Sequence, residues 1–259
     1  MRRFFVEELA KDKRLFSITG PEARHIIKVL RMEIGDQLIL SDGRGARFLA
    51  SIESASFKEV SVRLEESLPP SPPSPIKTIL CQALLKSRNM DYVIQKTSEL
   101  GVDSIYPFCS DRTVVRLDED KTAQRMRHWR RVAQSSAKQC DRGVPAEIGP
   151  LLKFRELIDK TKAQDALRVI FWEEEDSREF KDLLDSSQDV GAFVGIVGPE
   201  GGFSKNEVYE AREAGFVSVT LGHRILRAET AAITMVALVQ YVLGDLGRHR
   251  SPEAPSHVS

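Results

Sequence analysis

Two glycine-containing loops late in the chain could expose backbone amides to a ligand. Residues 198–202 are Gly-Pro-Glu-Gly-Gly and follow the apolar run 190–197. Gly222 follows the strand-like run 217–221 and opens a second loop. Because glycine lacks a Cβ and accepts positive φ, both loops would let a ligand approach the main chain. Gly-Pro and Gly-Gly pairs more often mark ordinary turns, but two adjacent loops of this kind at strand ends favour a ligand pocket.

Each loop leads into a predicted helix. Ser204 and Glu207 have the spacing of a capping box, which predicts that a helix begins directly after residues 198–203. The second loop runs into a long apolar helix that extends to about residue 243. The sequence therefore predicts two consecutive strand–loop–helix units, with both loops at the same end of their strands.

Charged side chains beside these loops are candidates for proton transfer and charge stabilisation. Glu200 and Glu229 are the nearby acids, and either could act as a general base. Arg227 could stabilise an anion. The alternatives are helix-end charges for the two acids and a salt bridge between helices for Arg227. His223 could accept a proton, but any turn residue would suffice at its position. No His or acid lies at a spacing that would let it bind a metal together with His223, so we expect no metal site.

Basic residues gather on one predicted helix, although the chain as a whole has a net charge of zero. Residues 121–142 contain one acid, Asp141, and a run of cations, namely Lys121, Arg125, Arg127, Arg130, Arg131, Lys138 and Arg142. Their apolar neighbours share the opposite face of the helix. A solvated surface is the commoner fate of such a run, but the shortage of acids favours contacts with phosphates. A shorter basic face is predicted near the amino terminus, at Arg24, Lys28 and Arg31.

Composition is typical of a folded protein. The chain has 259 residues, of which 41% are hydrophobic, enough for a sizeable core. The apolar run 231–243 is shorter than a membrane span and contains Gln240, and no signal peptide is recognisable, so we expect a cytoplasmic protein without membrane contact. Cys81, Cys109 and Cys140 are too few and too irregularly spaced for a disulfide framework or a zinc site, and we expect free thiols.

The proline- and serine-rich segment 69–75 divides the chain. It predicts an extended linker between a domain at residues 1–68 and a domain at residues 76–247. Short β-like runs around one helix predict a small β-barrel before the linker. After it, alternating strand and helix patterns predict an α/β domain with a parallel sheet and helices on both faces. Residues 248–259 are expected to be a disordered tail.

The positions of the glycines argue against a dinucleotide-binding fold. Such folds carry a Gly-x-Gly-x-x-Gly motif after the first strand. The first strand of the second domain is instead followed by residues 83–87, which contain no glycine, and the chain has no phosphate-binding Walker motif.

The two loops together resemble the signature of the SPOUT methyltransferases, specifically the RsmE family. The motif Leu-Gly-His-Arg-Ile-Leu-Arg-Ala-Glu-Thr-Ala at residues 221–231 carries most of this resemblance. Residues 85–91 with 95–102 are similar to the first helix of the family's catalytic domain, and residues 25–31 to its amino-terminal motif. The resemblance spans nearly the whole chain. One departure is Lys138, where the family usually has Glu, although Gln139 and Arg142 are retained.

The resemblance implies the fold and the reaction. The fold would be a SPOUT-type parallel sheet with a trefoil knot, preceded by a PUA-like β-barrel that binds RNA. The reaction would be methylation of N3 of a uridine in 16S ribosomal RNA by S-adenosylmethionine, in a homodimer formed through the carboxyl-terminal domain. The substrate would be 16S rRNA or the small ribosomal subunit. Two alternatives from other classes are a non-catalytic RNA-binding or ribosome-assembly protein and another α/β enzyme with a small ligand.

Site residues follow from the same motifs. The catalytic candidates are Arg227, Glu200 and Glu229. The expected cofactor slot offers open main chain, apolar contacts and one hydroxyl, from Val197, Gly198, Gly202, Leu221, Gly222, Ile225, Leu226, Thr230 and Ala231. Core packing is an equally good interpretation for Ile225 and Leu226. The expected RNA contacts are cations, namely Arg24, Lys28, Arg31, Lys86, Arg88, Arg127, Arg131 and Arg142.

Overall fold

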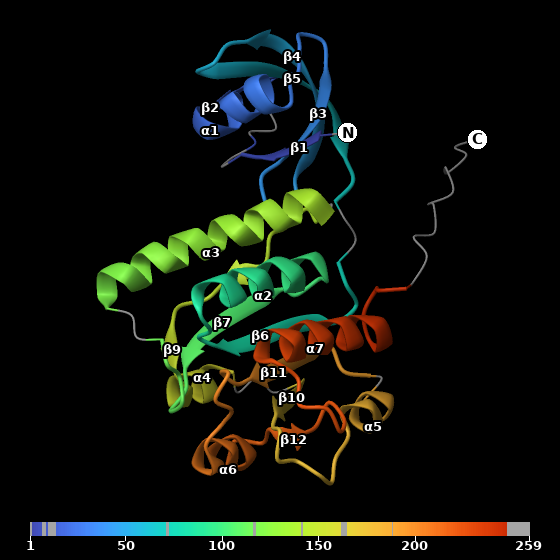
Figure 1. The fold of residues 1–259 in the computed structure, drawn as a ribbon. Helices are drawn as coiled ribbons and strands as arrows, with labels where there is room; N and C mark the ends of the chain where they lie inside the picture. Colours follow the sequence, from blue (N-terminus) through green and yellow to red (C-terminus); the bar gives the residue numbers. More distant parts are fainter. Residues whose placement is uncertain are drawn as a thin grey trace, which may run out of the picture.

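The computed structural model describes residues 2–6, 9, 14–70, 73–115, 118–140, 142–161, 165–187 and 189–247, without the side chain of Ser87. These residues form a small β-rich part and a larger α/β part, with a long helix between them (Figure 1). The predicted tail at 248–259 and part of the predicted linker lie outside the described residues. The domain boundaries that we inferred from the sequence stay predictions.

The amino-terminal part is a curled five-stranded sheet packed around a helical segment. Its strands are β1 (Arg2–Phe5), β2 (Leu15–Thr19), β3 (Gln37–Ser41), β4 (Arg47–Ala55) and β5 (Glu59–Leu68), in the order β1-β3-β4-β5-β2. The helical segment consists of α1 (Gly20–Arg24) and a π-helical turn, η1 (His25–Val29). Side chains over most of β4 alternate between buried and partly buried, as expected for a sheet with one face on the core. The predicted small β domain is confirmed.

The carboxyl-terminal part is a seven-stranded sheet in which every pairing is parallel. Its strands are β6 (Lys77–Ala83), β7 (Ser104–Cys109), β8 (Glu147–Ile148), β9 (Leu152–Lys153), β10 (Ala166–Phe171), β11 (Ala192–Val197) and β12 (Val217–Val219). The order is β12-β10-β11-β6-β7-β8, with β9 paired to β7. The predicted parallel α/β sheet is therefore confirmed, and the trefoil knot stays a prediction.

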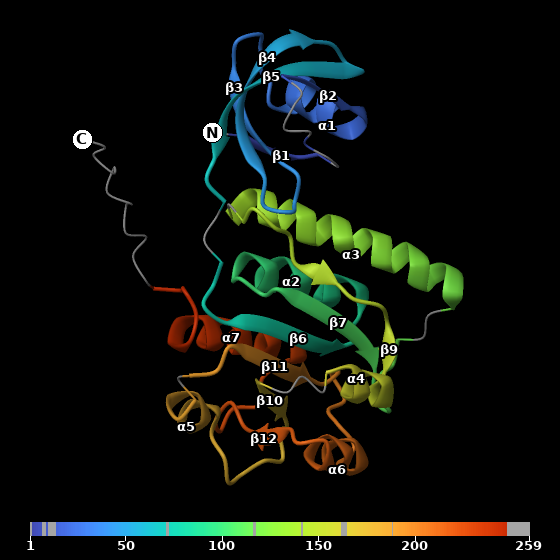
Figure 2. The same cartoon turned by 180° about the vertical axis from the view of Figure 1, so that it is seen from behind.

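Helices cover both faces of this sheet (Figures 1 and 2). One face packs against α2 (Ser87–Glu99), α3 (Glu119–Cys140), α5 (Phe180–Asp185) and α7 (Ala228–Val242), and the apolar core between them includes Leu80, Trp129 and Met235. The other face packs against α4 (Phe154–Lys160) and α6 (Lys205–Glu213). Alternate residues of the strands supply the two cores, because successive side chains point to opposite faces.

Helix α3 connects the two parts of the molecule. In both views it lies between the amino-terminal sheet and α2 (Figures 1 and 2). Lys138 near its end pairs with Glu22 of α1 at 2.5 Å, and both side chains are partly buried. The Ser41 hydroxyl of β3 donates to the Gly143 carbonyl at 3.2 Å. Lys138, the residue that departs from the family pattern, thus contributes to the contact between the two parts.

Within the described residues, no helix is long and apolar enough to cross a bilayer. The longest apolar helix, α7, is instead a core helix that contains the fully buried Gln240. The Gln240 amide donates to Thr78 Oγ1 and to the Gly101 carbonyl, and its oxygen accepts from Ser74 Oγ. The three cysteines are unpaired, as expected from the sequence.

Candidate active site

Both glycine loops begin at the same edge of the parallel sheet. Phe171 at the end of β10 is paired on one side with Val197 and on the other with Val219. Val197 is in turn level with Gln82 of β6. With roughly 4.8 Å between neighbouring strands, the two loops start about 10 Å apart. The strand register therefore places both loops at the carboxyl ends of their strands, as the sequence predicted.

The first loop is held tightly where it leaves β11. Gly202 has φ of +70°, and a Cβ there would lie 1.8 Å from Glu173 Oε1. A Cβ on Gly198 would meet the buried Phe203 ring at 3.0 Å. Ser204 and Glu207 form the predicted capping box, with the Glu207 amide donating to Ser204 Oγ at 3.2 Å. Glycine at these two positions is thus explained by packing within the protein as well as by ligand access.

The loop after β10 forms one side of this region and is braced by a buried acid. Glu175 accepts hydrogen bonds from the amide and hydroxyl of Ser177 and from Arg212 Nη2 at 2.7 Å. Burial raises the pKa of the Glu175 carboxyl, but hydrogen bonds to the carboxylate outweigh this effect and bring its pKa down to about 2. The Arg212 guanidinium also lies over the Trp172 ring, 5.5 Å from its centroid. The brace fixes α6 to the loop that contacts Gly202.

The second loop is more open. Gly222 has φ of +102°, and a Cβ there would meet no atom within 4 Å. Glycine is therefore needed for the backbone conformation, and open space remains for a ligand beside it. Ile225 on this loop is 89% exposed. Leu221 and Ala231 pack partly against the core, whereas Thr230 is exposed.

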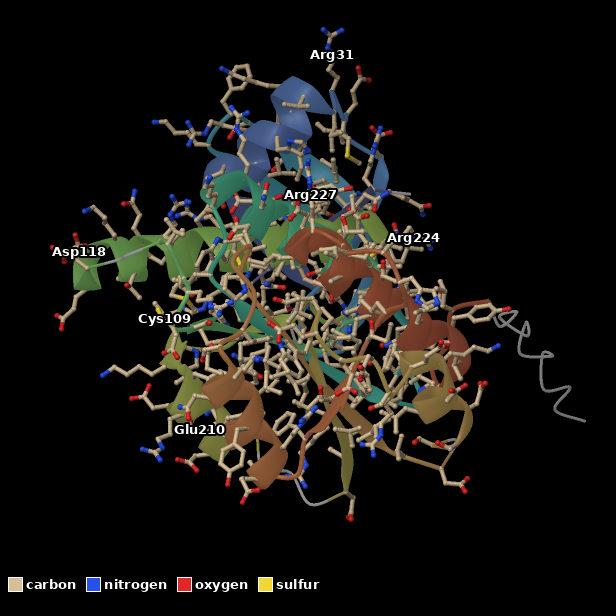
Figure 3. All side chains as sticks on the ribbon, turned by 60° about the horizontal axis from the view of Figure 1, so that its bottom comes forward. Arg31, Cys109, Asp118, Glu210, Arg224 and Arg227 are labelled. Carbon is tan, nitrogen blue, oxygen red and sulfur yellow. The ribbon has the colours of Figure 1, made fainter. Side chains whose placement is uncertain are left out.

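The three catalytic candidates differ in how they are held. Glu200 is exposed, and its Oε1 accepts a hydrogen bond from the backbone amide of Lys86 at 3.3 Å. Glu229 lies in the first turn of α7, and its Oε2 is buried without a hydrogen-bond partner among the described residues. Arg227 occupies the N-cap position of α7, and its exposed side chain makes no ion pair with a described residue. Figure 3 shows Arg227 and Arg224 at separate places around the start of α7.

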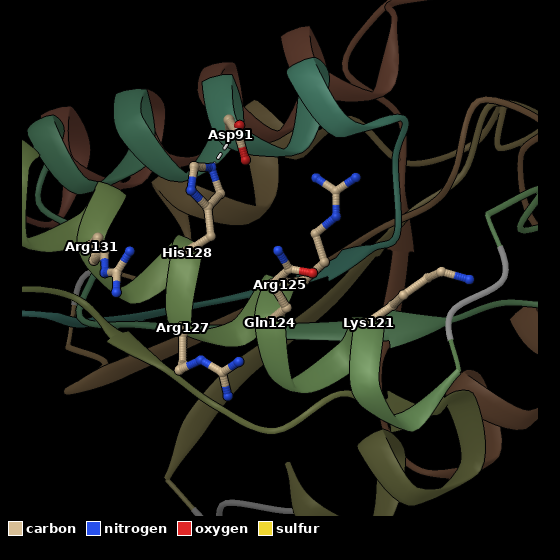
Figure 4. A pocket seen from close by; sticks show the side chains of 7 residues that line it. All are labelled: Asp91, Lys121, Gln124, Arg125, Arg127, His128 and Arg131. Carbon is tan, nitrogen blue, oxygen red and sulfur yellow. Dashed lines mark hydrogen bonds and ion pairs between the residues drawn. The ribbon is translucent and has the colours of Figure 1, made fainter.

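A cationic pocket lies between α2 and α3, and none of its described lining residues belongs to the glycine loops (Figure 4). It has a volume of about 740 Å³ and is lined by Asp91, Lys121, Gln124, Arg125, Arg127, His128 and Arg131. Asp91 is the only acid among the described residues that line it, and it is already engaged, because it binds His128 Nε2 at 2.9 Å and Trp129 Nε1 at 3.2 Å. The remaining lining is therefore strongly positive and suits a polyanion.

The expected RNA contacts fall into separate groups. Arg127 and Arg131 line the pocket, and Lys86 and Arg88 are exposed at the start of α2. Arg24, Lys28 and Arg31 are exposed on the amino-terminal domain, where Arg31 has φ of +53° after η1.

Arg142 stands apart from the other expected RNA contacts because it is turned inward. It donates to the Ser98 and Val102 carbonyls and pairs with Asp103 at 3.3 Å. These contacts give Arg142 a structural role at the end of α2, and its contact with RNA stays a prediction.

The sequence did not identify the partners of His128. His128 and Trp129 are neighbours on α3, but their common partner Asp91 lies 37 residues before His128. The pairing of α2 with α3 brings them together, and no local spacing predicts that contact. Lys121 and Gln124 were likewise not assigned to a site.

Comparison with known proteins decides the family. Residues 72–240 match the family model described as an RNA methyltransferase domain, and residues 18–65 match the RNA methyltransferase PUA domain. A curated relative from Bacillus subtilis, Ribosomal RNA small subunit methyltransferase E, is 31% identical, with 93% of this chain and 96% of that protein covered. The chain belongs to the ribosomal RNA small subunit methyltransferase E family.

Solved structures agree with this assignment. A family member from Neisseria gonorrhoeae, solved bound to S-adenosyl methionine, has a TM-score of 0.87 and 31% identity over 95% of this chain and 99% of that one. A methyltransferase from Legionella pneumophila, solved with SAM bound, also has a TM-score of 0.87, with 33% identity over 94% of this chain and 98% of that one. These matches support the predicted RNA methyltransferase over the two alternatives, a non-catalytic RNA-binding protein and another α/β enzyme with a small ligand.

Proposed function

We propose that this protein methylates N3 of a uridine in 16S ribosomal RNA, with S-adenosylmethionine as the methyl donor. Membership of the small subunit methyltransferase E family supports the reaction, and the two structural relatives with bound cofactor support the donor. The observation that carries the proposal is the meeting of the two glycine loops at one edge of the sheet. When bound, the cofactor supplies an electrophilic methyl group.

The loops fit such a cofactor. Residues 198–202 and 221–226 place main-chain groups at the sheet edge, where Gly222 leaves at least 4 Å of free space around its missing Cβ. The apolar Leu221, Leu226 and exposed Ile225 suit the adenine ring, and Thr230 offers a hydroxyl. The proposed slot consists of the nine residues predicted from the sequence, Val197, Gly198, Gly202, Leu221, Gly222, Ile225, Leu226, Thr230 and Ala231.

The chemistry requires removal of the uridine N3 proton before N3 attacks the methyl carbon. Arg227 is suited to stabilise the negative charge that develops on the ring oxygens, since its exposed guanidinium has no ion pair among the described residues. Of the two acids, Glu229 is better placed to act as the base. Its buried Oε2 has no hydrogen-bond partner among the described residues, whereas Glu200 already accepts a backbone hydrogen bond.

A pH profile distinguishes the two acids. If Glu229 removes the proton, the Glu229→Ala enzyme should be slow at neutral pH and recover partly as pH rises, because solvent then ionises N3. The Glu200→Ala enzyme should keep the parent's profile. Steady-state rates of all three proteins against pH test this assignment, and three parallel profiles would show that neither acid is the base.

The RNA is proposed to lie across the cationic pocket and the amino-terminal domain. Arg127 and Arg131 project from one helix with little opposing charge, which suits successive phosphates. The substrate would be 16S rRNA or the small ribosomal subunit, and the protein would act in the cytoplasm.

A second copy of the chain is the proposed partner. Ile225 on the open loop is 89% exposed, and Leu238 and Tyr241 on α7 are 37% and 66% exposed. Together they give the loop and the outer face of α7 an apolar character that a homodimer would bury. Measurement of the molar mass in solution tests this arrangement.

Calorimetric binding of S-adenosylmethionine tests the proposed function most economically. An enzyme should bind the cofactor without RNA, whereas a protein that only binds RNA should not. Absence of binding by a folded protein would contradict the proposal.

A further inference from the structure

Phe57 is a large aromatic side chain that the amino-terminal core does not use. It lies in the turn between β4 and β5 and is 61% exposed. It is not part of the apolar cluster around Ile26, Leu38 and Val62. Single exposed apolar side chains are common on protein surfaces, so the groups around the Phe57 ring decide whether it can contact another molecule.

The turn that carries Phe57 is well fixed. The Ser56 amide and hydroxyl both donate to the Glu59 carbonyl, at 2.8 and 2.9 Å, and Ser56 Oγ accepts from the Glu59 amide at 3.1 Å. The Glu59 carboxylate accepts from Ser17 Oγ of β2 at 2.6 Å. The ring is therefore presented from a rigid support, which lowers the entropic cost of binding through it.

One basic side chain contacts this ring, and two more lie on the same helical segment or at its end. Lys28 Nζ lies over the Phe57 ring, 5.4 Å from its centroid, within the range of a cation–π contact. Arg24 and Arg31 are exposed on the same helical segment and its end. An exposed aromatic ring beside cations is the combination that binds single-stranded nucleic acid, since the ring stacks on a base and the cations contact the adjoining phosphates.

We propose that Phe57 and Lys28 form a stacking platform for an unpaired base of the RNA substrate. The proposal rests on the RNA-binding function above and adds a defined subsite on the amino-terminal domain. Unpaired RNA is the occupant that fits best, because the bases of a duplex are stacked on each other and do not offer a free face to the ring. A sequence-independent contact is expected, as every base has such a face.

The test uses the full chain and one RNA sequence in two forms, as a single strand and annealed to its complement. Dissociation constants are measured by fluorescence anisotropy for the parent, Phe57→Ala, Phe57→Trp and Leu15→Ala. Leu15 is a matched control because it is 53% exposed on the same domain. Leu15 lies at the end of β2 that pairs with Arg63, and the opposite end of β2 pairs with Glu59, next to the turn that carries Phe57.

Phe57→Ala should weaken binding of the single strand by about 5- to 150-fold, the range for loss of one stacked base. Phe57→Trp and Leu15→Ala should bind it like the parent, and duplex binding should not change in these two variants or in Phe57→Ala. The loss should persist at high salt, whereas the loss caused by Lys28→Gln should shrink. All variants should bind S-adenosylmethionine like the parent, which shows that they are folded.

Parent-like binding of the single strand by Phe57→Ala would overturn the platform while leaving the proposed function intact. An equal loss on single strand and duplex would also overturn it, because the ring would then contact the backbone or a different partner. If the parent binds neither RNA, the proposed function itself fails, and the platform fails with it.

Discussion

The glycine-loop edge of the sheet and the pocket between α2 and α3 differ in how they are built. At the sheet edge, backbone conformation makes the site, with Gly202 and Gly222 at positive φ. In the pocket, side chains of regular helices make the site, and one acid is surrounded by cations. The first arrangement suits tight contact with a compact cofactor, and the second suits a long, flexible polyanion. Substitutions at the two regions should therefore affect different steps.

The largest effect is expected at Gly222. Gly222→Val should remove detectable binding of S-adenosylmethionine, because valine both strains the positive φ and fills the space beside the loop. Calorimetry of the parent, Gly222→Ala and Gly222→Val separates these causes. The alanine variant carries the backbone strain with less bulk, so weaker loss in alanine than in valine indicates steric exclusion of the cofactor. Parent-like affinity in a folded Gly222→Val protein would remove this loop from the cofactor site.

Arg227 should affect turnover and leave cofactor binding unchanged. Arg227→Ala should lower turnover by on the order of 10²-fold or more, the scale for loss of a group that stabilises a transition state. Lysine should rescue it poorly, since a point charge does not reproduce the planar guanidinium. Turnover and cofactor affinity measured for both variants provide the check. Near-parental turnover in Arg227→Ala would rule out anion stabilisation by this residue.

Substitution in the pocket should weaken RNA binding without affecting the cofactor. Arg127→Glu combined with Arg131→Glu should reduce RNA affinity at low salt, with a smaller difference at high salt, because phosphate contacts act through ion release. Arg130→Glu is a control on the same helix, since Arg130 is exposed but does not line the pocket. Equal RNA affinity of the parent and the double variant at low salt would indicate that α3 is only a solvated surface.

The brace beside the first glycine loop should affect stability in acid. The folded-state pKa of Glu175 is lowered from 4.5 to about 2, so its stabilising effect is complete above pH 4.5 and disappears as pH falls to about 2. The shift corresponds to at most about 3 kcal/mol. Glu175→Gln should lose this pH-dependent part of the unfolding free energy, as measured by urea unfolding across that range. Identical pH dependence in the parent and variant would contradict the role of the brace.

The same contrast explains what the sequence could predict. Ser204 and Glu207 are three residues apart, so their capping box and the strand before it follow from local sequence. The bonds from Asp91 to His128 and Trp129 depend on the packing of α2 against α3, which no local spacing specifies.

The charge pattern also did not predict which cations are exposed and which bind within the protein. Arg127 and Arg142 belong to the same basic run, yet one lines the pocket and the other binds main-chain carbonyls of the core domain. The tolerance of glycine for positive φ was part of the prediction for Gly222, and its φ of +102° agrees with it; the open space beside the loop is seen only in the structure.

The central claim is methyl transfer from S-adenosylmethionine to N3 of a uridine in small-subunit ribosomal RNA. The most direct test incubates the protein with isotopically labelled cofactor and small ribosomal subunits that lack the modification, with protein-free 16S rRNA in parallel. The RNA is then digested to nucleosides, which are identified by mass spectrometry. We predict labelled 3-methyluridine, at a rate on the order of 10²-fold lower when Arg227→Ala replaces the parent. Label on a ribose or another base, or no transfer to either RNA by a protein that binds the cofactor, would contradict the account.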